Sequence, residues 1–507
     1  MRKQDLASRR GNRSGLRPLA ALFAAILLVD PVRKLGLVDA PLILLIYVAT
    51  GIILLSLLLS GRGNRPSGPP LLPILLIALT AWCLVNAVLT QVPLVMVALG
   101  TATYVFFVPL VYAGIRIAES GTALTTLLRV VSIVGSLVGV GAIISSVLGP
   151  SAPVVLRPVA EDAAFHSFLE GNIYLSPSIF VSGEMAAEIL LVSLFAWLAS
   201  LSLSTHALGP AQALLGAAIA VGLLSTARRT VIAAALAGFV AFGLLRYLDS
   251  LKARNHPLAR KSAGLGPAVV LAVVGSASLV GSAGTDGLVP FLTVGSSEVL
   301  SRLTGMFSVL HPFALVGQGI GTSTQGLVQF GAIPLPGYFN GGLYNLYLFQ
   351  GRVLTAAEGG LAKAWLEIGV TGVLLYAAVF AVVIIGPFRR LRHLDGMGRA
   401  AILLVIALSI VFLKGHQSLD NPRIQPLYWI AAGIAWQRTR ERTGNAAPRK
   451  IQESNTTIAN SRGGYPEQGT PSPAMSWARG REERADHSNR RLHVQGPPNL
   501  PEERIIE

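Results

Sequence analysis

Stretches of about 20 apolar residues recur along most of this chain, separated by short polar segments. A helix of that length measures about 30 Å, which is the thickness of the hydrocarbon core of a bilayer. Since a helix satisfies its own backbone hydrogen bonds, it is the element that crosses lipid in this pattern. The sequence therefore predicts an all-α integral membrane protein.

The pattern predicts about twelve membrane spans. They lie near residues 17–32, 40–60, 71–90, 93–115, 122–148, 182–203, 209–225, 229–247, 266–284, 360–386, 399–414 and 424–437. These spans make residues 1–437 one membrane domain. The tail over 438–507 is polar and lacks apolar periodicity, so we expect it to be disordered.

Composition agrees with this class, because 52% of the residues are hydrophobic and only 13% are charged, whereas soluble domains have about 25% charged residues.

Cys83 is the single cysteine, so no intrachain disulfide forms, and no Cys/His spacing predicts a metal site. The net charge of +16 comes mainly from span ends and the tail. It predicts contact with anionic lipid headgroups rather than with nucleic acid.

The orientation follows from the bias of lysine and arginine towards the cytoplasm. With a cytoplasmic N-terminus, basic residues of six segments fall on the cytoplasmic side. They are Arg2, Lys3, Arg9, Arg10, Arg13 and Arg17; Arg62 and Arg65; Arg116; Lys252, Arg254, Arg260 and Lys261; Arg389, Arg390, Arg392 and Arg399; and Arg438, Arg440 and Arg442. Both termini are therefore predicted to be cytoplasmic.

Two longer segments then face outward, at 150–182 and at about 282–357. The second has roughly 75 residues and lies between the ninth and tenth spans. A connection of that length is usually functional or disordered, and its many aromatic residues argue against disorder. The sequence thus predicts a large ordered outer loop.

The pair Arg228-Arg229 interrupts an apolar stretch over 208–245, which as one helix would be about 57 Å long. The stretch must therefore form two spans that meet at these arginines, on the outer side, where basic residues are disfavoured. A guanidinium binds diphosphate in a bidentate manner, and the new helix adds free N–H groups. The alternative is a structural pair that reaches the interface at a span end.

The turn over 225–230, Ser-Thr-Ala-Arg-Arg-Thr, resembles the signature turn of the O-antigen ligase and O-antigen polymerase (Wzy-type) superfamily. The glycine-rich stretch over 312–322 and the span opening over 358–375 resemble two further motifs of that family. The layout of about twelve spans with a large loop before the tenth is similar as well. The resemblance covers roughly residues 180–435.

The resemblance implies an undecaprenyl-diphosphate-linked oligosaccharide as donor and a glycan as acceptor, at the periplasmic face of the bacterial inner membrane. It implies no metal and no cofactor, and other polysaccharide-assembly proteins as partners. Arg228 or Arg229 would hold the diphosphate and stabilise charge on the leaving group. The ligases carry a His-Asn pair ahead of the tenth span, where this chain has residues 344–348, Tyr-Asn-Leu-Tyr-Leu. The missing histidine favours a polymerase over a ligase.

Two further residues are candidate general bases. His311 is the single histidine of the large loop, and the alternative is a histidine that packs at the interface. Glu358 stands just before the tenth span, near the position of the ligase pair. Arg302 could extend the diphosphate site, although loop arginines are more often solvated.

Lys363 and Glu367 lie four residues apart at the opening of the tenth span, so a helix places them on one face. Charged residues that enter the bilayer usually face a wet cavity, and these two are candidates for the acceptor or donor site. The alternative is a neutralising structural pair. His416, in the last outer turn, is a third candidate for the same site.

A rival class is a transporter or flippase of a lipid-linked glycan or another anionic substrate. Twelve spans with both termini inside also describe many secondary transporters. Transporters usually repeat their broken helices in matching halves, and here the two halves do not match. The sequence favours chemistry at the outer face over alternating access.

Overall fold

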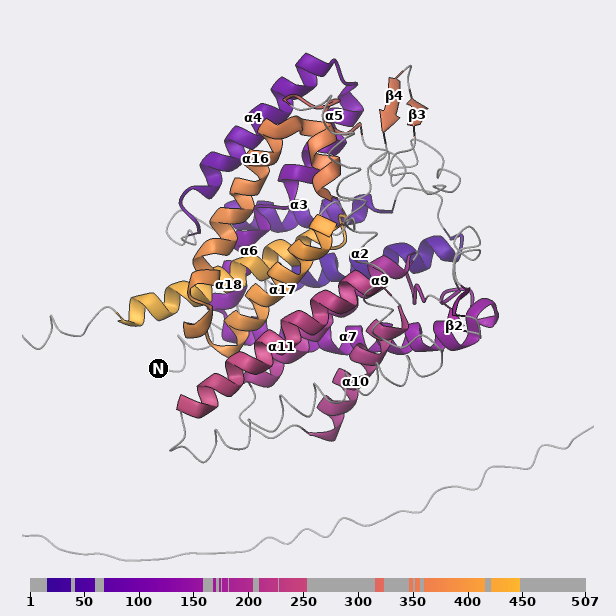
Figure 1. The fold of residues 1–507 in the computed structure, drawn as a ribbon, viewed down its shortest axis with the longest axis vertical. Helices are drawn as coiled ribbons and strands as arrows, with labels where there is room; N and C mark the ends of the chain where they lie inside the picture. Colours follow the sequence, from indigo (N-terminus) through magenta and orange to yellow (C-terminus); the bar gives the residue numbers. More distant parts are fainter. Residues whose placement is uncertain are drawn as a thin grey trace, which may run out of the picture. The chain divides into compact units, whose positions relative to one another are not determined.

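The computed structural model describes residues 16–37, 42–59, 68–157, 167–169, 173–174, 176–180, 182–203, 209–226, 228–252, 315–322, 346–349, 352–355, 360–414 and 421–446. All of them belong to one compact unit, residues 1–447, which is shown in Figure 1. This part of the chain is helical apart from two short hairpins and irregular segments such as 152–157, 176–180 and 315–322.

The helices follow the apolar stretches. They are α2 (Leu16–Lys34), α3 (Leu44–Leu59), α4 (Leu72–Thr90), α5 (Leu94–Thr101), α6 (Leu110–Glu119), α7 (Gly121–Leu148), α9 (Gly183–Leu203), α10 (Pro210–Ser225), α11 (Arg229–Lys252), α16 (Gly360–Arg389), α17 (Gly396–Lys414) and α18 (Gln425–Ala446). The hairpins are antiparallel and consist of β1 (Ser167–Leu169) with β2 (Ile173–Tyr174), and β3 (Leu346–Phe349) with β4 (Arg352–Thr355).

Among the described residues, seven helical stretches are long and apolar enough to cross a membrane. They are Leu72–Thr90, Met96–Glu119, Gly121–Ser151, Gly183–Leu203, Thr230–Asp249, Lys363–Arg389 and Gly396–Leu413. The chain is thus a helical, multi-pass membrane protein. The predicted span 266–284 and most of the predicted outer loop lie outside the described residues, so the count of twelve stays a prediction.

Two predicted spans contain breaks. The span predicted at 93–115 contains a π-helical turn, η2 (Ala102–Phe106), before α6 begins at Leu110. Pro109 has no N–H to donate to a continuous helix, which explains an interruption here. The second break lies inside α16, where Gly369 has a φ of 63°. At the other end of the chain, α18 continues to Ala446, beyond the predicted start of the disordered tail.

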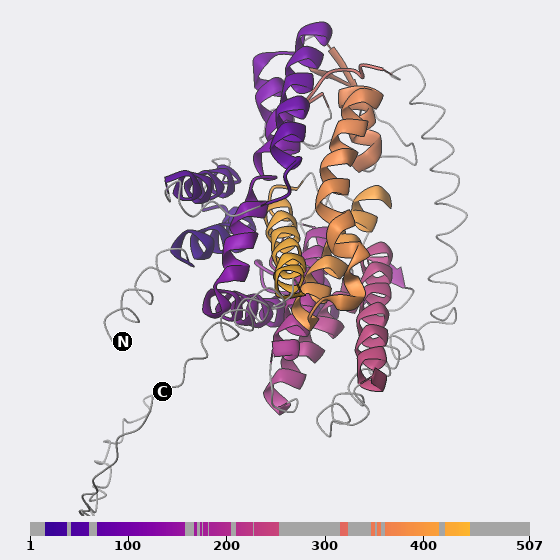
Figure 2. The ribbon, with the colours of Figure 1, turned by 90° about the vertical axis from the view of Figure 1, so that its left-hand side faces the viewer.

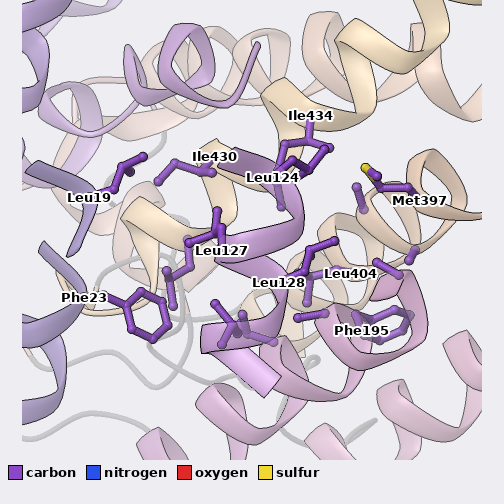
Figure 3. A pocket seen from close by; sticks show the side chains of 18 of the residues that line it. Leu19, Phe23, Leu124, Leu127, Leu128, Phe195, Met397, Leu404, Ile430 and Ile434 are labelled. Atoms are coloured by element: carbon purple, nitrogen blue, oxygen red, sulfur yellow. The ribbon is translucent and has the colours of Figure 1, made fainter. Parts of the chain in front are cut away.

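The helices pack as a bundle in which α17 and α18 are central. α17 contacts α9, α11, α16 and α18, while α18 also contacts α6 and α16 (Figure 2). α4 pairs with α16, and α7 packs against α9 and α10. Where α2, α7, α9, α17 and α18 meet, a cavity of about 70 Å³ with apolar lining remains (Figure 3). It is far smaller than a ligand pocket of about 300–1,000 Å³.

Small residues let several helix pairs approach closely, as is typical of membrane helices. A Cβ on Gly222 of α10 would lie 2.3 Å from the Cα of Gly139 in α7. A Cβ on Gly433 of α18 would lie 2.0 Å from the carbonyl oxygen of Val111 in α6. These contacts are backbone to backbone, so neither partner has a side chain that could move aside.

The bundle has two polar ends. The first, which we call the arginine-turn end, holds Arg228, with Glu184 at the start of α9, and the buried pair of Asp30 and Arg423. The second, which we call the basic end, joins the last residues of α9, α11, α16 and α18 to the start of α17. The 24 residues of α11 separate the two ends by about 36 Å.

Several segments that charge bias places on one side of the membrane meet at the basic end. Arg399 pairs with Asp249, and Arg246 approaches Gly396. Arg438 donates to the carbonyl oxygen of Ala118, at the end of α6. The structure therefore brings the predicted cytoplasmic ends of α6, α11, α17 and α18 together.

The close contact of α7 with α10 yields a stability prediction. Gly222→Ala adds one methyl group against backbone and should lower the free energy of unfolding by about 1–3 kcal/mol. Gly243→Ala in α11 makes the same change where nothing lies within 4 Å, so we expect a change of less than about 0.5 kcal/mol. Thermal unfolding of the detergent-solubilised protein measures both, and equal midpoints would contradict the described packing.

Candidate functional site

The arginine turn forms where α10 ends at Ser225 and α11 begins at Arg229, as the sequence predicts. Thr226 is fully buried and donates from its hydroxyl to the carbonyl oxygen of Leu223 over 2.7 Å. The carbonyl oxygen of Arg228 accepts the N–H of Ile232 over 3.0 Å and so starts the next helix. The turn is short and fixed at both sides, which holds Arg228 between two apolar helices.

The Arg228 side chain is partly engaged. Its Nη1 donates to the Glu184 carboxylate over 3.2 Å, and its side chain is 26% exposed. A Cβ on Gly183 would lie 3.4 Å from Nε, so the guanidinium packs against bare backbone. The Nε–H is buried and makes no hydrogen bond to any residue that the structure describes. The Nη1 group of the guanidinium is thus paired with a carboxylate, while the Nε–H can still donate a hydrogen bond to a ligand.

Sequence reasoning missed Glu184. The carboxylate lies in the first turn of α9 and meets Arg228 across 44 positions of sequence. Its signal was an acidic residue at the opening of an apolar span, on the same predicted side as the arginines. This partner means that Arg228 needs no ligand to balance its charge.

The structure describes some of the other predicted site residues and not others. Arg229 is the first residue of α11, and its side chain is outside the description. Arg302, His311, Glu358 and His416 lie outside the described residues. The grouping of the whole predicted diphosphate and acid–base set therefore stays a prediction.

A buried ion pair lies at the same end of the bundle. Arg423 Nη2 donates to Asp30 Oδ1 over 2.5 Å, and the two side chains are 5% and 0% exposed. The pair joins α2 to the turn before α18, across 393 positions of sequence. Arg423 Nε is buried and has no hydrogen-bond partner among the described residues. A second guanidinium donor is therefore unused at this end.

Lys34 ties the outer segment predicted at 150–182 to the bundle. It follows the predicted span 17–32, and its ammonium donates to the carbonyl oxygens of Val155 and Ser178 over 3.1 Å each. Burial lowers the pKa of Lys34 to about 8, although the charge of Asp30 acts in the opposite direction. Gly183 lies beside the carbonyl oxygen of Ser176 and beside Arg228. The segment thus helps to build the surroundings of the arginine turn.

A second polar region surrounds the break in α16, where Gly369 frees carbonyl groups at membrane depth. The N–H of Gln318 donates to the carbonyl oxygen of Leu366 over 2.5 Å, and that of Gly319 donates to Glu367 over 3.2 Å. Trp82 Nε1 donates to the carbonyl oxygen of Ile368 over 2.9 Å. Irregular backbone is tolerated at this depth because protein groups satisfy it.

The glycine-rich stretch fits into this break. Gly317, Gly319 and Gly321 have φ values of 85°, 121° and 75°, which other residues rarely adopt. Asn86 of α4 holds the stretch, since its amide donates to the carbonyl oxygen of Val316 and accepts the N–H of Ile320. The structure thereby joins residues 315–322 to the opening of α16, which are the described parts of the two stretches that carry the family resemblance.

Lys363 and Glu367 lie in the first half of α16 and are 3% and 1% exposed. The Glu367 carboxylate accepts a hydrogen bond from the Tyr104 hydroxyl over 2.7 Å. Tyr104 belongs to the π-helical turn, so the two helix interruptions meet at this carboxylate. Sequence reasoning missed Tyr104 and Asn86. Asn86 had a signal, as a lone amide in an apolar span.

No protein-family model and no curated protein matches this chain. The family resemblance therefore rests on the motifs alone.

The buried ion pair yields a second prediction. Asp30→Asn leaves the Arg423 charge uncompensated and should lower the free energy of unfolding by about 3–5 kcal/mol. Glu441→Gln removes a carboxylate from the more exposed pair with Arg438 and should cost about 0–1 kcal/mol. Both variants make the same chemical change, and thermal unfolding of the purified protein compares them. Equal losses of stability would show that Asp30 and Arg423 are solvated.

Proposed function

We propose that this chain is a glycan transferase of the bacterial inner membrane, and that it is a polymerase rather than a ligase. It would transfer an undecaprenyl-diphosphate-linked oligosaccharide onto a glycan acceptor at the periplasmic face. The proposal includes about twelve spans, both termini in the cytoplasm and a large outer loop over about 282–357. It treats the arginine-turn end as the periplasmic one.

The position of Arg228 carries the proposal. The residue lies in a short turn between two apolar helices, with a buried Nε–H that no described residue accepts. A lipid-linked diphosphate presents its charge at the level of such a turn while its chain remains in lipid. The free N–H groups at the start of α11 face the same turn and add affinity for an anion. Arginine and helix terminus together suit a diphosphate.

The basic end supports the orientation. The meeting of Arg246, Arg399 and Arg438 on one end concentrates positive charge there, which is the side that positive residues prefer. Arg228 then faces the opposite side, where Glu184 balances its charge. A lipid diphosphate on the periplasmic face would accept the Nε–H that Glu184 leaves unbonded.

The chemistry assigned to Arg228 is charge stabilisation. An acceptor hydroxyl attacks the anomeric carbon, the bond from that carbon to the diphosphate oxygen breaks, and undecaprenyl diphosphate leaves. Negative charge grows on the diphosphate oxygen in the transition state, where a preorganised guanidinium acts most strongly. A base must take the hydroxyl proton, and His311 and Glu358 remain the candidates. Inversion at the anomeric carbon follows from a single displacement.

A polymerase is favoured over a ligase because the ligase histidine is missing from residues 344–348. A polymerase needs two lipid-linked substrates side by side, and the chain has two candidate anion donors at one end, Arg228 Nε and Arg423 Nε. Arg302 and Arg229 stay candidates for the same diphosphate site.

A specific observation favours the alternative, a transporter or flippase. The break in α16 places Lys363 and Glu367 in the bundle interior, beside a second interrupted segment at Tyr104. Discontinuous helices with buried ionisable residues are typical of transporters. The alternative predicts movement of the lipid across the bilayer with the glycan unchanged. In the transferase reading, the same residues line the acceptor or donor site, together with His416.

The proposal predicts the effect of Arg228→Ala on chain growth. Without the guanidinium, the rate of polysaccharide extension should fall about 100- to 1,000-fold, because one preorganised donor to the leaving group is lost. The length distribution of the surface polysaccharide, compared by gel electrophoresis at equal protein level in the membrane, measures the loss. Arg157→Ala is the matched control, since Arg157 is exposed and bonds the carbonyl oxygen of Ala152 nearby.

Glu184→Gln separates a substrate role from a structural one. If Arg228 holds the diphosphate, this variant keeps most of the chain growth, whereas Arg228→Ala loses it. If Arg228 serves only to pair with Glu184, the two variants behave alike. Full-length polysaccharide with Arg228→Ala would refute the proposal outright.

A further inference from the structure

A concave surface lies at the basic end, at the opposite end of α11 from the arginine turn. It has a volume of about 740 Å³ and forms where α11, η5 (Leu391–His393), α17 and α18 meet. Its charged lining consists of Arg246, Asp249, Arg390, Arg392, Asp395 and Arg399. Arg228 and Arg246 are separated by on the order of 27 Å along the helix, so this pocket is distinct from the proposed donor site.

The carboxylates of this pocket are already engaged. Both oxygens of Asp249 accept from Arg399, whose guanidinium also donates to the carbonyl oxygens of Leu391 and Arg392. Asp395 accepts the N–H of Gly398 over 2.8 Å and lies 4.0 Å from Arg438 Nε. Four arginines against two aspartates leave the lining with a net charge of +2. The ion pair of Arg399 and Asp249 thus holds the pocket wall in place, and the net positive charge of the lining can attract an anion.

Arg246 is held in place at the wall of the pocket. Its guanidinium carbon lies 5.7 Å from the centre of the Phe242 ring. A Cβ on Gly396 would lie 3.2 Å from its Nη2, which shows how closely the start of α17 covers it. Arg392 is exposed at the rim. Arg246, which is held at the wall of the pocket, and Arg392, which is exposed at its rim, both present positive charge to a ligand that enters from the surface.

A second depression of about 580 Å³ adjoins this one and shares Arg390 and Thr439 with it. It adds Arg389 and Arg440 to the positive surface. The two depressions together run along the ends of α16 and α18. The positive surface is therefore larger than one phosphate group requires.

The pocket opens beside apolar helix surface. On α11, Leu244 and Tyr247 are 56% and 50% exposed, within one turn of Arg246. On α16, Ile385 and Phe388 are 45% and 54% exposed, just before Arg389. Exposed apolar side chains on a membrane helix face lipid chains. A ligand at this place meets positive charge at one end and hydrocarbon contacts at the other.

We propose that this basic pocket binds the phosphate headgroup of an anionic phospholipid from the adjacent leaflet. The phosphate lies against Arg246 and Arg392, and the acyl chains lie along α11 and α16. Basic pockets at the ends of membrane helices bind such headgroups in this manner. A soluble phosphate compound would use the arginines but not the apolar surface. Binding joins the ends of α11, α16, α17 and α18 and stabilises the bundle.

The test uses the purified full-length chain in nanodiscs of phosphatidylcholine with and without phosphatidylglycerol. Native mass spectrometry counts retained phosphatidylglycerol, and thermal unfolding measures the stabilisation that it gives. Replacing Arg246 and Arg392 by glutamine should weaken retention roughly 10- to 30-fold. Arg392→Gln alone changes an exposed side chain, so it keeps the test valid if the double variant does not fold. Arg157→Gln, an exposed arginine of the outer segment, is the control.

Preferential retention of phosphatidylglycerol that is lost in the pocket variants and kept in the control supports the proposal. Equal retention of phosphatidylcholine and phosphatidylglycerol would overturn it, as would full retention in the pocket variants. Glycerol 3-phosphate, added to the protein in phosphatidylcholine alone, should give no stabilisation. If it stabilises the protein as phosphatidylglycerol does, the ligand is a soluble phosphate compound and the lipid assignment is wrong.

Discussion

Lipid offers no hydrogen bonds, so each polar group among these helices must find a partner within the chain. The break at Gly369 is possible because Gln318, Gly319, Trp82 and Asn86 bond the freed carbonyl groups. Asp30 and Arg423 enter the core together for the same reason. A few buried groups nevertheless have no partner among the described residues, and the Nε–H groups of Arg228, Arg423 and Arg438 are among them. The Nε–H of Arg228 lies in the arginine turn, where we propose that a substrate group binds.

The two ends of the bundle use arginine in different ways. At the basic end, Arg399 and Arg438 are paired with aspartates and with carbonyl oxygens, and the excess charge suits the lipid surface. At the other end, Arg228 has one carboxylate partner and one unused donor. Arg438 also has a buried Nε–H without a hydrogen-bond partner, so an unused donor alone does not distinguish the two ends. We propose the donor site at Arg228 because this residue stands in a turn between two apolar helices, on the side of the membrane that basic residues avoid.

Hydropathy located the helices well, because lipid selects strongly for apolar length. The span predicted at 71–90 is α4 (Leu72–Thr90), and the predicted turn at Arg228 is where α10 ends. Hydropathy did not predict which polar side chains pair with each other. Arg423 contacts Asp30 across 393 positions of sequence, and Tyr104 contacts Glu367 across 263. Pairing at such separations depends on how helices pack, which a local pattern does not contain. The break at Gly369 looks in sequence like any glycine of a membrane helix, and only the close approach of the Leu315 and Val316 backbone leaves no room for a side chain there.

We propose that the arginine-turn end forms glycosidic bonds while a lipid diphosphate leaves. The purified protein, placed in a bilayer and supplied with undecaprenyl-diphosphate-linked repeat units, tests this proposal when the mass of every lipid-linked product is followed. We expect chains of two or more repeat units, with one undecaprenyl diphosphate released for each bond formed. Unchanged repeat units that have crossed to the other leaflet would contradict it and would establish the transporter instead.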